Sequence, residues 1–157
     1  MNFQTMNKQR KFILIAAAIG VIAMFLPWVS ISVMGMSFGN VNGMHGFGIL
    51  VFLCFLGCAG ITLVGDQTKP LDKTMWMISL IASGLAALIM IINFLRALDA
   101  ISYFSVGFYL AIAASLAVLF ATYQYRAAGF NVKDGFDSLK DDIEKKTKND
   151  NPTPPAV

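Results

Sequence analysis

Four long stretches of this chain contain no aspartate, glutamate, lysine or arginine and consist mainly of apolar residues. They cover residues 12–32, 45–64, 75–95 and 102–123. A helix needs about 20 apolar residues to cross roughly 30 Å of hydrocarbon, and each stretch is of that order. The sequence therefore predicts a four-span transmembrane domain over residues 1–128.

The bulk composition favours the same class. The chain is 57% hydrophobic and 13% charged, whereas a typical soluble domain carries about 25% charged residues. The four stretches leave no room for a separate soluble domain. Because short connections make successive helices antiparallel neighbours, we expect an all-α membrane protein, an up-and-down bundle of four transmembrane helices.

The basic residues predict the orientation of this domain. Of the 12 lysines and arginines, only Arg96 falls in a connection on the far side. The cytoplasmic side of a membrane protein is enriched in such residues, which places both termini in the cytoplasm. The net charge of +3 then reflects topology and contact with anionic inner-leaflet lipid, not nucleic-acid binding. The residues on the basic side are Lys8, Arg10 and Lys11, then Lys69 and Lys73, then Arg126 and Lys133.

The first apolar stretch has the basic start of a signal peptide, but it lacks a convincing small-residue cleavage pattern. Trp28 suits a membrane interface, so we expect the stretch to be retained as a helix. Cys54 and Cys58, four residues apart in the second stretch, are expected to serve as small packing residues.

The first outer connection, residues 30–43, differs from a plain loop. Apolar and polar residues alternate on both sides of Gly35. A period of two predicts a short β-hairpin, which Asn42-Gly43 would turn into the second helix.

The C-terminal segment changes in composition. Val132, Phe136, Leu139 and Ile143 recur at helical spacing between acidic and basic residues. This pattern predicts a cytoplasmic amphipathic helix within residues 129–148, with Asp134 capping its start. Residues 149–157 include three prolines and are expected to form a disordered tail.

Small residues recur at helical spacing in every apolar stretch. Such residues let helices approach closely in lipid, where hydrophobic exclusion does not drive association. The residues expected at helix contacts are Ala16, Gly20, Gly57, Gly60, Ser79, Ser83, Ala87, Gly107, Ala111 and Ser115, with Ala113, Ala117 and Ala121 on a second stripe of the fourth stretch.

The apolar stretches carry no ionisable residue of the kind that transporters place along an ion pathway. The sequence also lacks a nucleophile–histidine–acid set, a phosphate-binding glycine loop and a pair of catalytic carboxylates. We therefore expect neither an ion-coupled transporter nor an enzyme, and no cofactor.

Asn93, Arg96 and Asp99 recur every three residues where the third stretch ends. In one interpretation Arg96 extends outward and pairs with Asp99 at a spacing of i, i+3. In the other, the three residues form a polar anchor for the outer hairpin or for a partner.

The outer segment also contains Met34, Met36, Met44 and His45. Thioethers and an imidazole are soft ligands that suit Cu(I), which makes these residues a candidate metal site. The alternative is that the methionines are apolar filler, since the chain has 9 in all and several lie where no metal is expected.

The run Phe25-Leu26-Pro27-Trp28-Val29-Ser30, and residues 103–110 at the start of the fourth stretch, carry a resemblance. The chain resembles small four-span bacterial membrane proteins in which Leu-Pro-Trp ends the first helix. This resemblance implies the same topology in the bacterial cytoplasmic membrane and no particular activity. The layout is also similar to that of claudin-like proteins, but their outer-loop cysteine pair and Gly-Leu-Trp motif are missing, so the likeness is one of layout alone.

Three functions remain open from the sequence. The first is a non-enzymatic accessory or scaffold subunit that packs against itself or another membrane protein. The second is an oligomeric channel or exporter with its pore between protomers. The third is a Cu(I)-binding protein that uses the outer methionines and histidine.

Overall fold

The computed structural model describes residues 3–33, 36–96, 98–125 and 131–150. In chain order its elements are α1 (Lys8–Phe25), β1 (Pro27–Val33), β2 (Met36–Asn42), α2 (Gly48–Leu63), α3 (Lys73–Arg96), a 3-10 helix (Leu98–Tyr103), α4 (Val106–Gln124) and α5 (Val132–Asp150). The chain is thus mostly helical with one small antiparallel sheet, and the predicted β-hairpin is confirmed.

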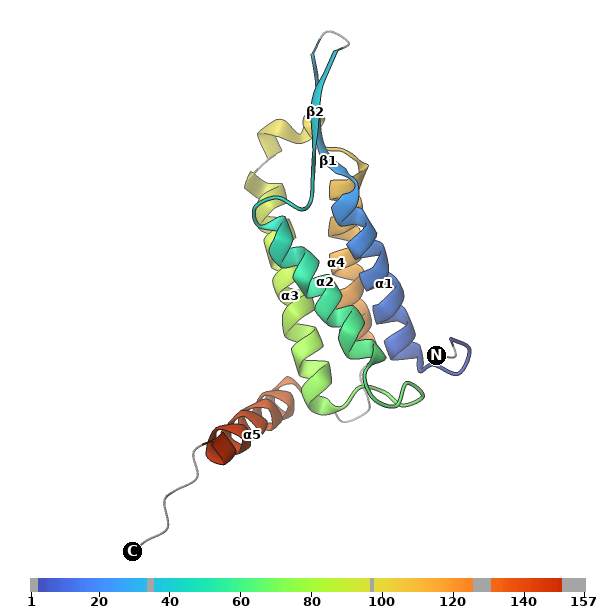
Figure 1. Cartoon of the computed structure of the whole chain (residues 1–157), viewed down its shortest axis with the longest axis vertical. Coiled ribbons are helices and arrows are strands. Elements are labelled where there is room, and N and C mark those ends of the chain that lie inside the picture. The colour runs from blue at the N-terminus through green and yellow to red at the C-terminus, as the bar shows by residue number, and fades with distance from the viewer. Residues whose placement is uncertain (1–2, 34–35, 97, 126–130, 151–157) are drawn as a thin grey trace, which may run out of the picture.

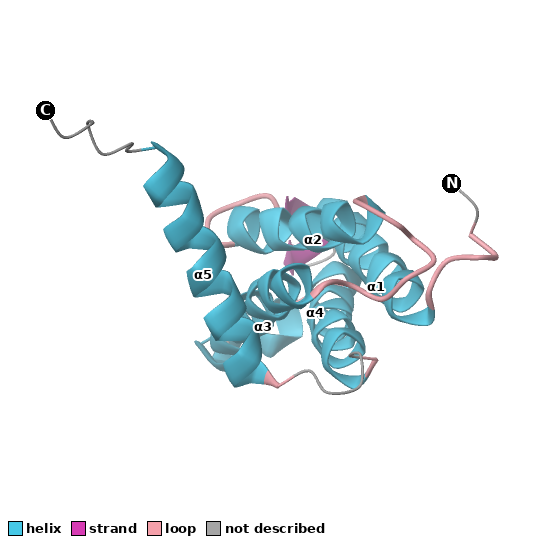
Figure 2. Ribbon diagram, turned by 90° about the horizontal axis from the view of Figure 1, so that it is seen from below, coloured by secondary structure: helices cyan, strands magenta, loops and turns pink. Residues whose placement is uncertain are grey.

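Helices α1 to α4 lie side by side and run alternately up and down (Figure 1). Helix α1 contacts α2 and α4, and α3 contacts the same two helices from the other side (Figure 2). The two strands project from one end of this group, which we call the hairpin end. The opposite end, where α1 begins and α5 crosses the start of α3, is called the terminal end.

Helix α1 begins earlier and ends earlier than the sequence predicted. The Asn7 side chain caps it by accepting a hydrogen bond of 2.9 Å from the Gln9 amide, so Lys8, Arg10 and Lys11 lie within the helix. At the other end Pro27 has no amide hydrogen to donate and holds Leu26 in an extended conformation, with φ −73° and ψ 155°. The prediction of a first helix reaching residue 32 is therefore wrong, because β1 starts at Pro27.

The hairpin rests on the ends of α1 and α4. Its strands pair from Pro27 opposite Asn42 to Val33 opposite Met36. The Gly43 amide donates to the Met24 carbonyl at 2.9 Å, and the Ser105 amide donates to the Trp28 carbonyl at 2.9 Å. These bonds anchor both strands to the helices that flank them.

The remaining boundaries differ by a few residues. Helix α4 starts at Val106 instead of residue 102, because Leu98–Tyr103 forms a 3-10 helix. Helix α5 starts at Val132, so Asp134 lies in its first turn and does not cap it. Helix α5 also includes residues 149 and 150, and the rest of the predicted tail, residues 151–157, lies outside the described residues.

Two of the described helices, α3 and α4, are long and apolar enough to cross a membrane. Helix α2 has 16 residues, a length of about 24 Å. Helix α1 has 18 residues, but its first turn carries Lys8, Arg10 and Lys11. Among the described helices, α3 and α4 therefore have the length and the apolar composition that crossing a membrane requires.

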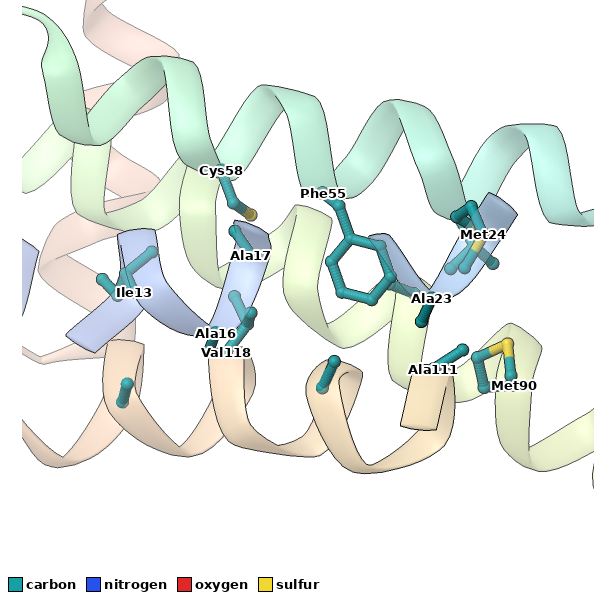
Figure 3. Close-up of a cluster of buried hydrophobic side chains, with 14 of the residues drawn as sticks. Ile13, Ala16, Ala17, Ala23, Met24, Phe55, Cys58, Met90, Ala111 and Val118 are labelled. Carbon is teal, nitrogen blue, oxygen red and sulfur yellow. The ribbon is translucent and has the colours of Figure 1, made fainter. Parts of the chain in front are cut away.

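A hydrophobic cluster fills the space between the four helices (Figure 3). Phe55 projects from α2 toward α1, where Gly20 leaves room for its ring: a Cβ atom at Gly20 would lie 2.6 Å from the ring carbons. Met90 of α3 and Ala111 and Val118 of α4 complete the cluster from the other side. The core is thus built from small residues facing a few large ones.

Candidate functional site

Most of the small residues expected at helix contacts are buried. Gly57 and Gly60 of α2 are exposed, as are Ala113 and Ala117 of α4. Among the described residues, no atom lies within 4 Å of where the Cβ atoms of Gly57 and Gly60 would be, so these two glycines do not lie at a helix contact there. The buried residues are Ala16, Gly20, Ser79, Ser83, Ala87, Gly107, Ala111, Ser115 and Ala121.

Gly107 marks a close approach at the hairpin end. A Cβ atom there would lie 2.7 Å from the Pro27 carbonyl oxygen and 2.8 Å from the Leu26 Cβ atom. Ser115, one turn below Ala111, donates its hydroxyl to the Ile112 carbonyl at 2.8 Å. This buried stripe of α4 therefore packs without an unsatisfied hydroxyl.

The second small-residue stripe of α4 lies on a different face. Ala113 and Ala117 are exposed, and with Ala121 they form part of a groove of about 440 Å³ between α1 and α4. We call it the lateral groove. Its large side chains stand on both helices, and the full lining is Phe12, Ile15, Ala16, Ile19, Leu110, Ala113, Ala114, Ala117, Phe120, Ala121 and Tyr125.

The lateral groove has a defined end. The rings of Phe12 and Tyr125 stack at 5.0 Å between centroids, with an angle of 7° between their planes. Both residues line the groove, so this aromatic pair marks its terminal end. A groove with a small-residue floor and large apolar walls accepts the side chains of another helix.

Helix α3 carries a row of large apolar side chains on its outer face. Ile81, Leu85 and Leu88 are all exposed and follow one another at spacings of four and three residues. This is the spacing at which side chains form a continuous ridge along one helix face. We call these three residues the α3 ridge. Helices α2 and α4 lie between α1 and α3, so α1 and α3 are on opposite sides of the group of four helices (Figure 2).

A second hollow lies at the hairpin end and combines aromatic with polar side chains. It has a volume of about 210 Å³ and is lined by Trp28, Phe104 and Phe108 together with Asn42, His45 and Asn93, among others. The ring centroids of Trp28 and Phe108 are 5.4 Å apart, and those of Phe104 and Phe108 are 4.2 Å apart. These contacts fix the aromatic wall.

A smaller pocket of about 180 Å³ adjoins it and is lined by Phe47, Ile89, Ile92, Asn93 and Arg96. Three of these residues, Phe47, Ile89 and Asn93, line both pockets. Asn93 donates its side-chain amide to the Ile89 carbonyl at 2.8 Å. We call the two adjoining pockets the hairpin-end crevice.

The predicted ion pair between Arg96 and Asp99 is not formed. Within the described residues, a salt bridge joins Lys69 and Asp66 at 3.4 Å, and none joins Arg96 and Asp99. Helix α3 ends at Arg96, and Asp99 belongs to the following 3-10 helix, so the spacing of i, i+3 on one continuous α-helix is lost. Both side chains are exposed.

The proposed Cu(I) ligands are only partly within the described structure. Met34 lies outside the described residues, and the side chain of Met36 does as well. Met44 packs against the hydrophobic cluster, whereas His45 is exposed and its Nδ1 lies 3.0 Å from Asn42 Oδ1. Within the described residues, histidine, cysteine, aspartate and glutamate form no group of three that could hold a metal.

Sequence reasoning missed a buried polar cluster at the terminal end. Arg10 is 4% exposed, and its guanidinium donates to the carbonyls of Lys69 at 2.9 Å, Thr62 at 3.1 Å and Val64 at 2.6 Å. Gln9 Oε1 accepts from the Leu71 amide at 3.1 Å. The start of α1 thereby holds the end of α2 and the connection to α3.

A periodic signal for this cluster is present in the sequence. Residues 9, 10, 13, 16, 17 and 20 share one buried face of α1, on which Gln9 and Arg10 continue the stripe of Ile13, Ala16 and Ala17. Polar residues on an otherwise buried stripe indicate internal hydrogen bonds. The positive-inside rule uses only the charge of Arg10 and gives no information about the helix face on which Arg10 lies.

Helix α5 docks across the start of α3. Gly135 lies against Trp76 and Met77, since a Cβ atom there would be 3.0 Å from the Met77 sulfur. The Thr74 hydroxyl donates to Asp142 Oδ2 at 2.8 Å. Phe136 and Ile143 of the predicted apolar face are nevertheless exposed at 55% and 58%.

The connection between α2 and α3 contains a turn that side-chain hydrogen bonds stabilise. Asp66 Oδ1 accepts hydrogen bonds from the Thr68 hydroxyl at 2.6 Å and from the Thr68 amide at 3.0 Å. These bonds, with help from Lys69, hold the pKa of Asp66 below its usual value. Gly65, with φ of +76°, supplies the left-handed conformation that ends α2.

The two cysteines are free. Cys58 is buried against α3, where its thiol donates to the Ser79 carbonyl at 3.7 Å. This contact fits the expected packing role.

Comparisons with known proteins add no relative to these observations. No model of a known protein family matches the chain, and neither a curated protein nor a solved structure matches it.

Proposed function

We propose that this chain is a multi-pass protein of the cytoplasmic membrane that acts as a non-enzymatic scaffold or accessory subunit by packing against copies of itself. The observation that carries the proposal is that the chain exposes both a groove with a small-residue floor, the lateral groove, and a row of large apolar side chains, the α3 ridge. Both are open on the same molecule, and they lie on different sides of it.

Membrane insertion of all four helices is supported by the large apolar side chains on their outer faces. Each of α1 to α4 exposes several large apolar side chains. Soluble monomers rarely expose contiguous apolar patches larger than a few hundred Å², because such surfaces drive association. Examples on successive helices are Ile19 and Ile22, Leu53 and Leu56, Leu85 and Leu88, and Leu116 and Phe120.

The terminal end is then the cytoplasmic end. It contains the basic residues at the start of α1 and in the connection from α2 to α3, whereas Arg96 is at the hairpin end. A short helix such as α2 is accommodated by local thinning of the bilayer or by packing among longer helices. Phe47 and Val64, both exposed, extend its apolar surface by one residue at each end.

Self-association is supported by the side chains that the two faces expose. In lipid, helices associate through close packing, and small residues opposite large ones give the closest approach. Ala113 and Ala117 offer the small side, and Leu85 and Leu88 offer the large side. Because groove and ridge are different surfaces, the contact is head-to-tail, and it closes into a ring when the rotation between copies allows.

Cross-linking between two differently tagged copies tests this contact. In a background with Cys54 and Cys58 replaced by alanine, Leu85→Cys in one copy and Ala117→Cys in the other are expected to form a disulfide on oxidation in native membranes. The matched control pairs Ala117→Cys with Leu56→Cys, which is 43% exposed on α2. Equal yields from the two pairs, or none from the first, would contradict the proposed contact.

A groove-filling variant provides the second test. Ala117→Leu places a large side chain on the groove floor, and we expect at least about a tenfold loss in the equilibrium constant for association. Gly57→Leu is the control, since it adds a larger apolar side chain at an open position of α2. The oligomer fraction is measured by single-molecule photobleaching in liposomes.

A ring built from head-to-tail contacts encloses a central space, which keeps an oligomeric channel as the second candidate function. Ion flux through liposomes that contain the cross-linked oligomer tests it. Flux equal to that of empty liposomes removes the channel and leaves the scaffold.

A further inference from the structure

The hairpin-end crevice joins an apolar trough to an unpaired cation. Arg96, at the last position of α3, is exposed and forms no ion pair within the described residues. It is also the single lysine or arginine of residues 12–64 and 75–125. An unpaired guanidinium suits a phosphate or carboxylate, and the adjoining apolar surface suits an apolar part of the same ligand.

The trough below Arg96 is suited to a hydrocarbon chain. Phe47, Ile89 and Ile92 line the smaller pocket, and Ile89 lies one helical turn below Asn93. Phe47 is 62% exposed and Ile92 is 38% exposed, so the trough opens to the outside of the helices. A ligand can therefore enter from the side.

Asn93 connects the two halves of the crevice. It is half-buried, lines both pockets and uses one amide hydrogen on the Ile89 carbonyl. Its side-chain oxygen, for which the structure shows no hydrogen bond within the described residues, is available to accept one from a hydroxyl group of a ligand. His45, exposed in the wider pocket, adds a second polar group within the same crevice.

From this arrangement we infer that the hairpin-end crevice binds one anionic phospholipid of the outer leaflet. Its phosphate pairs with Arg96, a head-group hydroxyl donates to Asn93, and one acyl chain lies along Ile89 and Ile92. The guanidinium forms two parallel hydrogen bonds with phosphate, an arrangement that lysine cannot reproduce. This inference depends on the membrane insertion proposed above, but not on self-association.

Titration of the delipidated full-length protein with defined lipids, followed by native mass spectrometry, tests the inference. We expect one phosphatidylglycerol molecule to bind about tenfold more tightly than phosphatidylcholine. In Arg96→Gln this preference is expected to vanish, and in Arg96→Lys to fall partway. Lys8→Gln removes a positive charge at the terminal end and is expected to keep the preference.

Three results would overturn the inference. They are equal binding of the two lipids by the unmodified protein, an unchanged preference in Arg96→Gln, and binding of glycerol phosphate without acyl chains as tight as that of phosphatidylglycerol. The last result would identify a soluble phosphate as the ligand. Ala117→Leu separates this site from the proposed oligomer, because it disrupts association and is expected to leave the lipid preference unchanged.

Discussion

Replacing Arg10 by glutamine removes the group that connects α1 to the end of α2 and to the connection that follows. Three hydrogen bonds from a charged guanidinium are lost, to the carbonyls of Thr62, Val64 and Lys69. A bond to a charged group contributes about 1.5–3 kcal/mol when it is buried. Because two of the three bonds are only partly buried, water replaces much of their contribution, and we expect a total loss of about 3 kcal/mol.

Lys8→Gln is the matched control for this substitution. It removes the same charge from the same end, but Lys8 is exposed, so we expect a change below about 0.5 kcal/mol. Reversible unfolding by detergent in mixed micelles measures the free energy. Hydrogen exchange of the Leu71 amide, which is bonded to the neighbouring Gln9, reports local release of the connection. An equal loss in both variants would refute the reasoning, since it would mean that Arg10 acts through charge alone.

Two further predictions concern a helix contact and a turn. Gly20→Ala is expected to destabilise the fold by about 1–3 kcal/mol in the same unfolding assay, because the new methyl group meets the buried Phe55 ring, whereas Gly57→Ala, at an open position, costs little. Thr68→Val is expected to raise the pKa of Asp66 toward its usual value, as followed by carboxyl carbon NMR, because the hydroxyl bond that lowers it is lost. Because the pKa of Asp66 is depressed, its ionised carboxylate stabilises the turn at pH values above the ordinary carboxyl pKa. This stabilisation is lost as the pH falls through the pKa of Asp66 in the folded state. An unchanged pKa in Thr68→Val would contradict this account of the turn.

Much of the fold follows from local sequence patterns. Apolar runs locate the helices, and the alternation around Gly35 locates the hairpin. The ends of the helices are harder to predict, because hydropathy does not distinguish an apolar strand from a continuing helix. Pro27 is the residue that ends the first helix, and its missing amide hydrogen was the available signal.

Side-chain roles depended on neighbours that a single sequence does not reveal. The spacing of small residues predicted buried positions such as Gly20 and Gly107, but it also selected Gly57 and Gly60, which face away from the other helices. Spacing defines a helix face without defining its partner. The internal hydrogen bonds of Arg10 were missed for the same reason, since its acceptors lie more than 50 residues away in sequence.

The central claim is that four helices cross the membrane and leave the hairpin end outside and the terminal end inside. Single cysteines in a cysteine-free background, probed with a membrane-impermeant maleimide, test it most directly. Val41→Cys and Leu98→Cys at the hairpin end are expected to be labelled on intact cells. Lys69→Cys and Lys140→Cys are expected to react only after the cells are permeabilised. Labelling of Val41→Cys and Lys69→Cys from the same side of the membrane would contradict the account.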